Sequence, residues 1–176
     1  MWLILFFRIC LVGSFLFAVW KWGDWKNWKK YYPTVLFVMV VNLGASYITY
    51  HHGLWNYHQD QLVKTQSTVE LINSFVMLPS STFVFLSNFP VNRKLYQYGY
   101  ILLWVLIFSS LEYIDKTIGG IYYSNGWLWQ ISTIFDIAMF SIIRLHHLSP
   151  LRAWLITLFL TGVILIVFNF GSAEMK

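Results

Sequence analysis

Six apolar segments follow one another along the chain, and each is close to the ~20 residues that an α-helix needs to cross a bilayer core. Short polar or aromatic connections separate them. We expect helical spans at approximately 2–20, 33–50, 68–89, 98–114, 127–143 and 153–170. The pattern predicts an all-α, polytopic transmembrane bundle of six spans, or five if one segment is re-entrant. This bundle forms a single integral membrane domain over 1–176.

Two prolines modify this picture. Pro33 is expected to open the second span, because proline is well tolerated in the first turn of a helix. Pro79 falls in the middle of the third span, where it removes a backbone donor and should kink the helix. The hydroxyl groups of Ser80, Ser81 and Thr82 follow it directly and can satisfy the carbonyl groups that the kink frees.

The composition points to a membrane protein. Only 11% of the residues are charged and 58% are hydrophobic, whereas a soluble domain has about 25% charged residues. So few charges would leave large apolar patches in water, which argues against a soluble enzyme or a nucleic-acid-binding domain. We therefore expect the lipid bilayer as the partner of this chain, together with a possible membrane-protein partner. The single cysteine, Cys10, cannot form an intramolecular disulfide.

Basic residues divide unequally between the two sides of the predicted bundle. The first, third and fifth connections contain Lys21, Lys26, Lys29, Lys30, Arg93, Lys94, Arg144 and Arg152. The opposite side contains Lys64, Lys116 and Lys176. By the positive-inside rule we expect the Lys21–Lys30 connection in the cytoplasm and both termini outside the cell membrane. Tryptophan and tyrosine gather near the span ends, which is typical of an aromatic belt at the membrane interface.

Several stretches carry a resemblance to a known family. The most specific are Trp25–Pro33, Leu111–Ile114, Asn125–Trp127 and Met139–Trp154. Over about four fifths of its length the chain resembles a family of small multi-pass membrane proteins of Gram-positive endospore-forming bacteria. The resemblance implies a membrane location, a multi-pass topology and a link to sporulation, but no activity, cofactor or catalytic residue.

Ionisable residues inside predicted spans are the main candidates for a functional site, because burying each one in the membrane is costly. An outer polar cluster is predicted from Arg8, Glu70, Glu112, Asp115, His51 and His52. In one interpretation these residues line an outward-facing pocket in which Arg8 pairs with Glu70 or Glu112. In the other, the pair only joins two helices. The histidine spacing matches no metal-binding signature, so we predict no metal site.

Two further polar groups are predicted. Asn42, Gln130 and Asp136 are expected to form a polar seam in the middle of the membrane. We favour a structural role for Asp136, as a protonated acid hydrogen-bonded to a neighbouring helix, over a role as the proton-binding group of a carrier. Both Asp136 and Asp115 depart from the pattern of the resembled family. Near the inner end of the fifth span, basic residues are candidates for binding lipid headgroups. Alternatively, their charge only complements the negative end of the helix dipole. These residues are Arg144, His146, His147 and Arg152.

The sequence contains no G-x-S-x-G, P-loop, Rossmann or zinc signature, which argues against the enzyme classes built on these motifs. It favours a non-catalytic membrane component of the envelope or spore that acts through lipid or protein partners. No cofactor is expected. Two alternatives stay open. The first is a small transporter or permeation module that uses the intramembrane carboxylates. The second is an intramembrane enzyme acting on a lipid or isoprenoid, with Glu112 and Asp136 as acid and base. A cavity around Asp136 would favour the transporter, although the sequence shows no internal repeat of the kind that is common in carriers. A filled interior would favour the partner protein.

Overall fold

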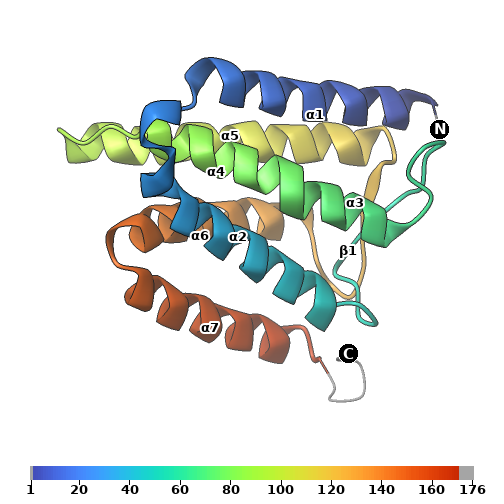
Figure 1. The fold of residues 1–176 in the computed structure, drawn as a ribbon. Helices are drawn as coiled ribbons and strands as arrows, with labels where there is room; N and C mark the ends of the chain where they lie inside the picture. The colour runs from blue at the N-terminus through green and yellow to red at the C-terminus, as the bar shows by residue number, and fades with distance from the viewer. Residues whose placement is uncertain (1, 171–176) are drawn as a thin grey trace.

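The computed structural model describes residues 2–170 and shows an all-α helical bundle (Figure 1). Its uninterrupted long helices are α1 (Trp2–Trp22), α2 (Trp28–Ile48), α5 (Lys94–Thr117), α6 (Trp129–Leu148) and α7 (Pro150–Val167). One further long helical segment is built from α3 (Gln66–Ile72), a π-helical segment η2 (Asn73–Met77) and α4 (Leu78–Ser87). Within the described part of the chain, six helices are thus long and apolar enough to cross a membrane.

The spans agree with the expected positions to within a few residues, with two exceptions. The short 3₁₀ helix η1 (Trp25–Asn27) leads into α2, which begins at Trp28, so Pro33 lies inside the helix and does not open it. Proline is tolerated there because the carbonyl that it leaves without a donor belongs to Lys29, which is exposed near the helix end. The predicted turn over 144–152 shrinks to Ser149, which links α6 directly to α7.

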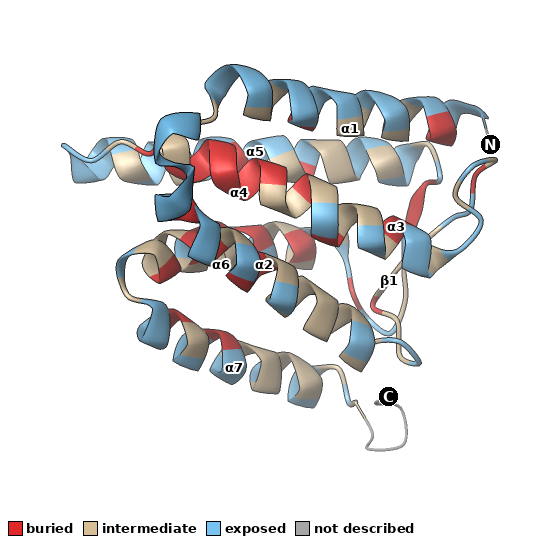
Figure 2. Ribbon diagram, in the orientation of Figure 1, coloured by how far each residue is buried: buried red, intermediate tan, exposed pale blue. Residues whose placement is uncertain are grey.

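The third span is irregular directly before Pro79, and the sequence did not predict the form of this irregularity. Asn73–Met77 form a single turn of π-helix directly before α4, with Pro79 in the first turn of that helix. The N–H of Leu78 donates to the carbonyl of Asn73, which is the wider bonding pattern of a π turn. Beyond it, every residue from Ser80 to Leu86 is buried, which makes α4 the central helix of the bundle (Figure 2).

Two short strands interrupt the helical pattern at one end of the bundle, and the sequence did not predict them. Strand β1 (Trp55–Tyr57) lies in the connection between α2 and α3, and β2 (Ile121–Tyr123) lies between α5 and α6. They pair antiparallel, with Asn56 opposite Tyr122. Because the paired strands belong to connections far apart in the sequence, they join two loops into one cap over this end, here called the sheet end (Figure 1).

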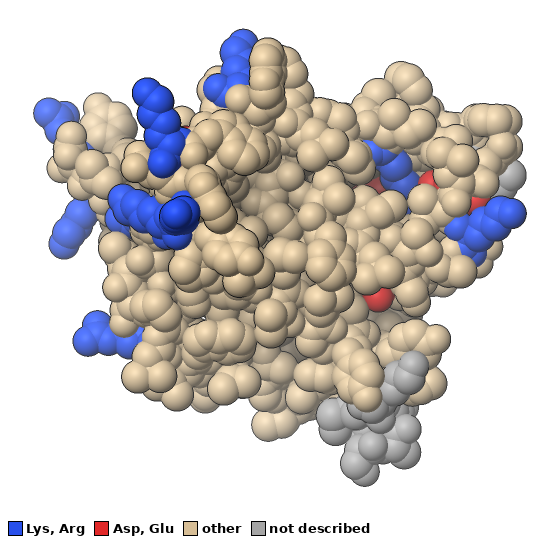
Figure 3. All heavy atoms as spheres, in the orientation of Figure 1, with Lys and Arg blue, Asp and Glu red and all other residues tan. Residues whose placement is uncertain are grey.

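The opposite end, where α1 joins α2, is called the basic end. Lys and Arg side chains gather there, while the helical surface between the two ends is almost free of charge on the face that Figure 3 shows. Large apolar side chains cover that surface; on α7, for example, Leu151, Phe159 and Ile166 are each more than two-thirds exposed. An exterior of this kind suits lipid and not water. Lys176, which the orientation argument also used, lies outside the described residues.

Aromatic rings fill the interior on the side of the basic end. Phe85 and Phe140 are fully buried, with their ring centroids 5.2 Å apart, and Trp104 packs against both. Toward the sheet end the interior changes, because polar residues of α5 and α6 join the aromatic rings there. The interior of the bundle is therefore filled near the basic end and contains space near the sheet end.

Candidate functional site

A cavity of about 210 Å³ lies inside the bundle beneath the β1–β2 cap, and we call it the acidic cavity. Residues from α1, α2, η2, α5, α6 and both strands contribute to its wall. Its polar lining consists of Asn42, Tyr57, Asn73, Glu112, Asp115, Ser132 and Asp136. The three acids carry the same charge when ionised, and no Lys, Arg or His occurs among the described residues that line the cavity.

Asp136 is the most deeply buried of these acids. It lies on α6, about 10 Å along the helix from its first residue at a rise of 1.5 Å per residue, and it is only 6% exposed. Its Oδ2 atom finds no hydrogen-bond partner among the residues that the structure describes. A buried carboxyl oxygen without a partner is costly, which makes Asp136 the main candidate in this wall for contact with a ligand.

Glu112 and Asp115 lie one helical turn apart on α5 and differ in their surroundings. The hydroxyl of Tyr123 on β2 donates to Oε1 of Glu112 at 2.7 Å. Oδ1 of Asp115 has no hydrogen-bond partner within the described chain and packs directly against Gly120. A side chain at position 120 would collide with this oxygen, so the glycine is required by close approach.

Hydrogen bonds hold the remaining polar lining in place. Nδ2 of Asn42 donates to Oγ of Ser74 at 2.7 Å, and Ser74 donates to the carbonyl of Glu70. The Nδ2 group of Asn73 donates to the Tyr57 hydroxyl oxygen at 3.2 Å. The π turn therefore brings Asn73 to the cavity and Ser74 to Asn42, which is consistent with the frequent occurrence of such turns at functional sites.

Burial raises the pKa of Tyr57, which the nearby acids raise further. Burial and the hydrogen bond to Glu112 also raise the pKa of Tyr123. Both phenols therefore stay protonated at neutral pH and act as hydrogen-bond donors or acceptors at the cap side of the cavity.

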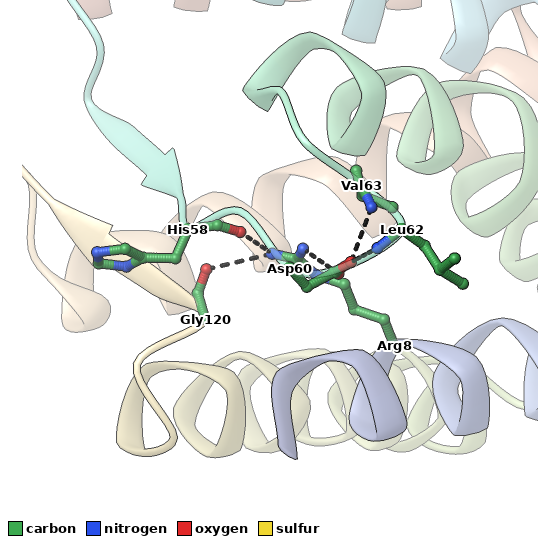
Figure 4. A network of polar contacts seen from close by, with 6 residues as sticks. All are labelled: Arg8, His58, Asp60, Leu62, Val63 and Gly120. Carbon is green, nitrogen blue, oxygen red and sulfur yellow. Dashed lines mark hydrogen bonds and ion pairs between the residues drawn. The ribbon is translucent and has the colours of Figure 1, made fainter. Parts of the chain in front are cut away.

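Arg8 lies beside a second cavity of about 420 Å³, which shares Tyr57, Asn73 and Asp115 with the first. Its guanidinium donates to Oδ2 of Asp60 at 2.7 Å and to the carbonyl of His58 at 2.7 Å, with a longer bond of 3.4 Å to Gly120 (Figure 4). The expected pairing of Arg8 with Glu70 or Glu112 is therefore wrong. The partner is Asp60, because the connection after β1 folds back onto α1.

Arg8 thus fastens the cap to the bundle, because His58 follows β1 and Gly120 precedes β2. Asp60 also accepts hydrogen bonds from the backbone N–H groups of Leu62 and Val63, each at 2.8 Å. Burial opposes its ionisation, but the bonds from Val63 and Arg8 outweigh burial and hold the pKa of Asp60 below its usual value. The ion pair therefore persists at neutral pH.

The other members of the predicted outer cluster lie elsewhere. Glu70 accepts a hydrogen bond from Gln66 at 2.9 Å on the same helix, and neither Glu70 nor a histidine of the cluster lines either cavity. His51 is exposed beside Tyr50, and the ring of His52 contacts Phe170. The structure brings Glu112 and Asp115 together, with Arg8 in the adjoining cavity, and leaves the remaining three residues of the cluster outside.

The predicted mid-membrane seam is found in part. Asn42 and Asp136 line the same cavity, but Gln130 is exposed on the outside of α6. Residues six positions apart on an α-helix point about 120° away from each other, which accounts for the separation of Gln130 from Asp136.

The four basic candidates near the C-terminal end of α6 do not form one surface. His146 is buried, accepts or donates a hydrogen bond of 3.0 Å with Thr34, and stacks on Phe37. His147 stacks on Tyr31, and Arg144 lies 4.3 Å from the ring centroid of Phe89. Arg152 is exposed on α7. His146 therefore joins helices inside the bundle and does not face the headgroup region.

Within the described residues, no group of three or more His, Cys, Asp or Glu side chains is arranged to hold a metal ion. Fold and cavity together define a class: an all-α protein with six helices suited to cross a membrane and an acidic cavity near one end of its helical bundle. No protein-family model, curated protein or solved structure matches the chain.

Proposed function

We propose that the protein is a small cation carrier of the cell membrane, in which the acidic cavity binds the cation, protons included. The observation that carries this proposal is the cavity itself, with the deeply buried Asp136 in its wall, whose Oδ2 atom has no hydrogen-bond partner among the described residues. A partner or scaffold protein needs no such space. Three carboxyl groups that face one cavity inside a membrane favour positive charge there, because ionisation without a counter-charge is costly.

The shape of the interior favours a carrier over an open channel. The rings of Phe85, Trp104 and Phe140 close the bundle between the cavity and the basic end. Passage of a cation therefore requires these packed rings to rearrange, as in a transporter that opens to its two sides in turn.

The orientation follows the distribution of charge. In our proposal the basic end lies in the cytoplasm, by the positive-inside rule, and the sheet end faces outward. Glu112 and Asp115 line the cavity on the side of the sheet end, where their carboxyl groups attract cations. An inside-negative membrane potential would then drive uptake of a bound cation.

Uptake into vesicles tests the proposal. Purified protein is reconstituted into liposomes, and uptake of protons, sodium, rubidium and choline is measured under an imposed inside-negative potential. We expect at least one cation to enter faster than in protein-free vesicles, and Asp136→Asn to lower that rate about tenfold, because it removes the buried charge. Glu70→Gln is the matched control, since Glu70 lines neither cavity. If none of the four cations enters faster than in protein-free vesicles, the carrier proposal is wrong.

A further inference from the structure

The apolar wall of the acidic cavity is largely aromatic. Trp55 of β1 and Trp127 before α6 both line it, with ring centroids 5.2 Å apart. Phe135 on α6 also lines it and lies 6.4 Å from Trp55 and 6.2 Å from Trp127. Aromatic faces attract cations through their ring quadrupoles, and tryptophan does so most strongly.

Asp136 follows Phe135 directly on α6, so a buried carboxyl and this aromatic group face the same cavity. A hard metal cation needs six or more oxygen ligands at short range, and the described acids are not grouped in that way. An organic ammonium ion needs no such shell, because its alkyl groups pack against aromatic rings while its charge is balanced by one carboxylate. The volume of about 210 Å³ is below the usual range for drug-sized ligands, which limits the ligand to a small one.

We propose that the acidic cavity binds a small organic ammonium ion, with its charged nitrogen beside Asp136 and its alkyl groups against Trp55, Trp127 and Phe135. This inference rests on the cation-binding role proposed above and names the class of ligand. Glu112 and Asp115 complete the negative surroundings of the bound cation, while Tyr57 and Asn73 offer hydrogen bonds to a polar group of the ligand.

Binding of choline to the purified protein in detergent tests the inference directly. The comparison ligand is the neutral isostere of choline, in which a carbon atom replaces the ammonium nitrogen. Calorimetry measures affinity, and tryptophan fluorescence reports on the cavity wall through Trp55 and Trp127. We expect saturable binding of choline at least about tenfold tighter than that of the isostere. Equal affinities for the two ligands, or no binding of choline, would overturn the inference without any variant being needed.

Two variants place the ligand within the cavity. Asp136→Asn and Trp55→Leu should each weaken choline binding about tenfold, because one removes the counter-charge and the other an aromatic face. Glu70→Gln, the matched acid-to-amide control, should bind choline as the unmodified protein does. If choline bound equally well to Asp136→Asn, confirmed as folded by its circular dichroism, the assigned site would be wrong.

The two proposals fail separately. Choline that binds in detergent while none of the four cations enters vesicles would keep the ammonium site and reject the carrier. If protons or sodium enter vesicles but choline does not bind, the carrier proposal stands and the ammonium ligand is wrong.

Discussion

Arg8 and Asp60 form an ion pair that is almost fully removed from solvent, with the side chains 12% and 0% exposed. Breaking such a pair by removing one partner leaves a charge in surroundings of low polarity. If Asp60 is the partner removed, Arg8 keeps its bonds to the carbonyl groups of His58 and Gly120, which reduce the cost in stability. The pair matters to the fold because it ties the cap to α1 at the side of the cavities.

Asp60→Asn should therefore destabilise the protein by roughly 1–3 kcal/mol at neutral pH. Thermal unfolding in detergent, followed by circular dichroism, measures the effect as a fall in Tm. Glu70→Gln serves as the control, since its carboxylate makes a hydrogen bond to Gln66 on the same helix and no ion pair in the described chain. A Tm for Asp60→Asn equal to that of the unmodified protein would show that Arg8 needs no counter-charge.

The same pair predicts a dependence of stability on pH. Folding lowers the pKa of Asp60, so the unfolded chain binds the proton more tightly than the folded one. The stabilisation by the carboxylate is complete above the unfolded pKa of about 4 and is lost as the pH falls through the folded pKa. The gap in Tm between the unmodified protein and Asp60→Asn should therefore narrow on acidification. A constant gap from about pH 7 to about pH 3 would contradict the pKa shift.

Which site residues could be predicted from the sequence depends on where they lie. Asn42, Glu112 and Asp136 stand out because each interrupts an apolar span, and all three line the acidic cavity. Asp60 and Tyr57 belong to a polar connection in which nothing distinguishes them from their neighbours. Their roles depend on a loop folding back onto α1, and local hydropathy carries no information about that contact.

At the scale of the elements, the sheet is the part that sequence patterning does not reveal. Strands of three residues are too short for an alternating pattern, and their pairing joins residues more than sixty positions apart. The π turn before Pro79 is likewise not revealed by the sequence, from which only a kink at Pro79 was expected. The cap and the π turn both contribute to the cavity wall. The sequence therefore predicts the helices around the cavity but not the cavity itself.

A disulfide across the cap tests both its register and its mobility. In a Cys10→Ser background, Asn56→Cys and Tyr122→Cys introduce cysteines at directly opposed positions. Opposed residues of antiparallel strands have Cα atoms about 4.5–5.5 Å apart, which is within the range of a disulfide. We expect oxidation to join them almost completely, as measured by blocked thiol labelling. The pair Asn56→Cys with Lys116→Cys is the control, because Lys116 lies outside the sheet.

If cations enter through the cap, the cross-linked protein should lose uptake in vesicles and regain it on reduction. Uptake that is unchanged by complete cross-linking would show that the ligand reaches the acidic cavity by another route, between the helices. Absence of a cross-link would contradict the pairing of Asn56 with Tyr122.

On the scale of the whole molecule, charge is separated along the bundle. Connections between the helices place the Lys21–Lys30 segment, Arg93, Lys94 and Arg152 at the basic end, whereas the acids of the cavities belong to the sheet end, together with Arg8, Lys64 and Lys116 (Figures 1 and 3). In our proposal the excess of basic residues at the basic end orients the protein in the membrane. The carboxyl groups that line the cavity attract cations to it in the same proposal.

Accessibility of single cysteines in intact cells tests this arrangement. In the Cys10→Ser background, Lys64→Cys lies at the sheet end and Lys29→Cys at the basic end, and both positions are exposed. We expect a membrane-impermeant maleimide to label Lys64→Cys from outside and to label Lys29→Cys only after the cells are permeabilised. The reverse pattern would turn the sheet end toward the cytoplasm. The membrane potential would then hold a bound cation at that side, and the carrier would have to work in export.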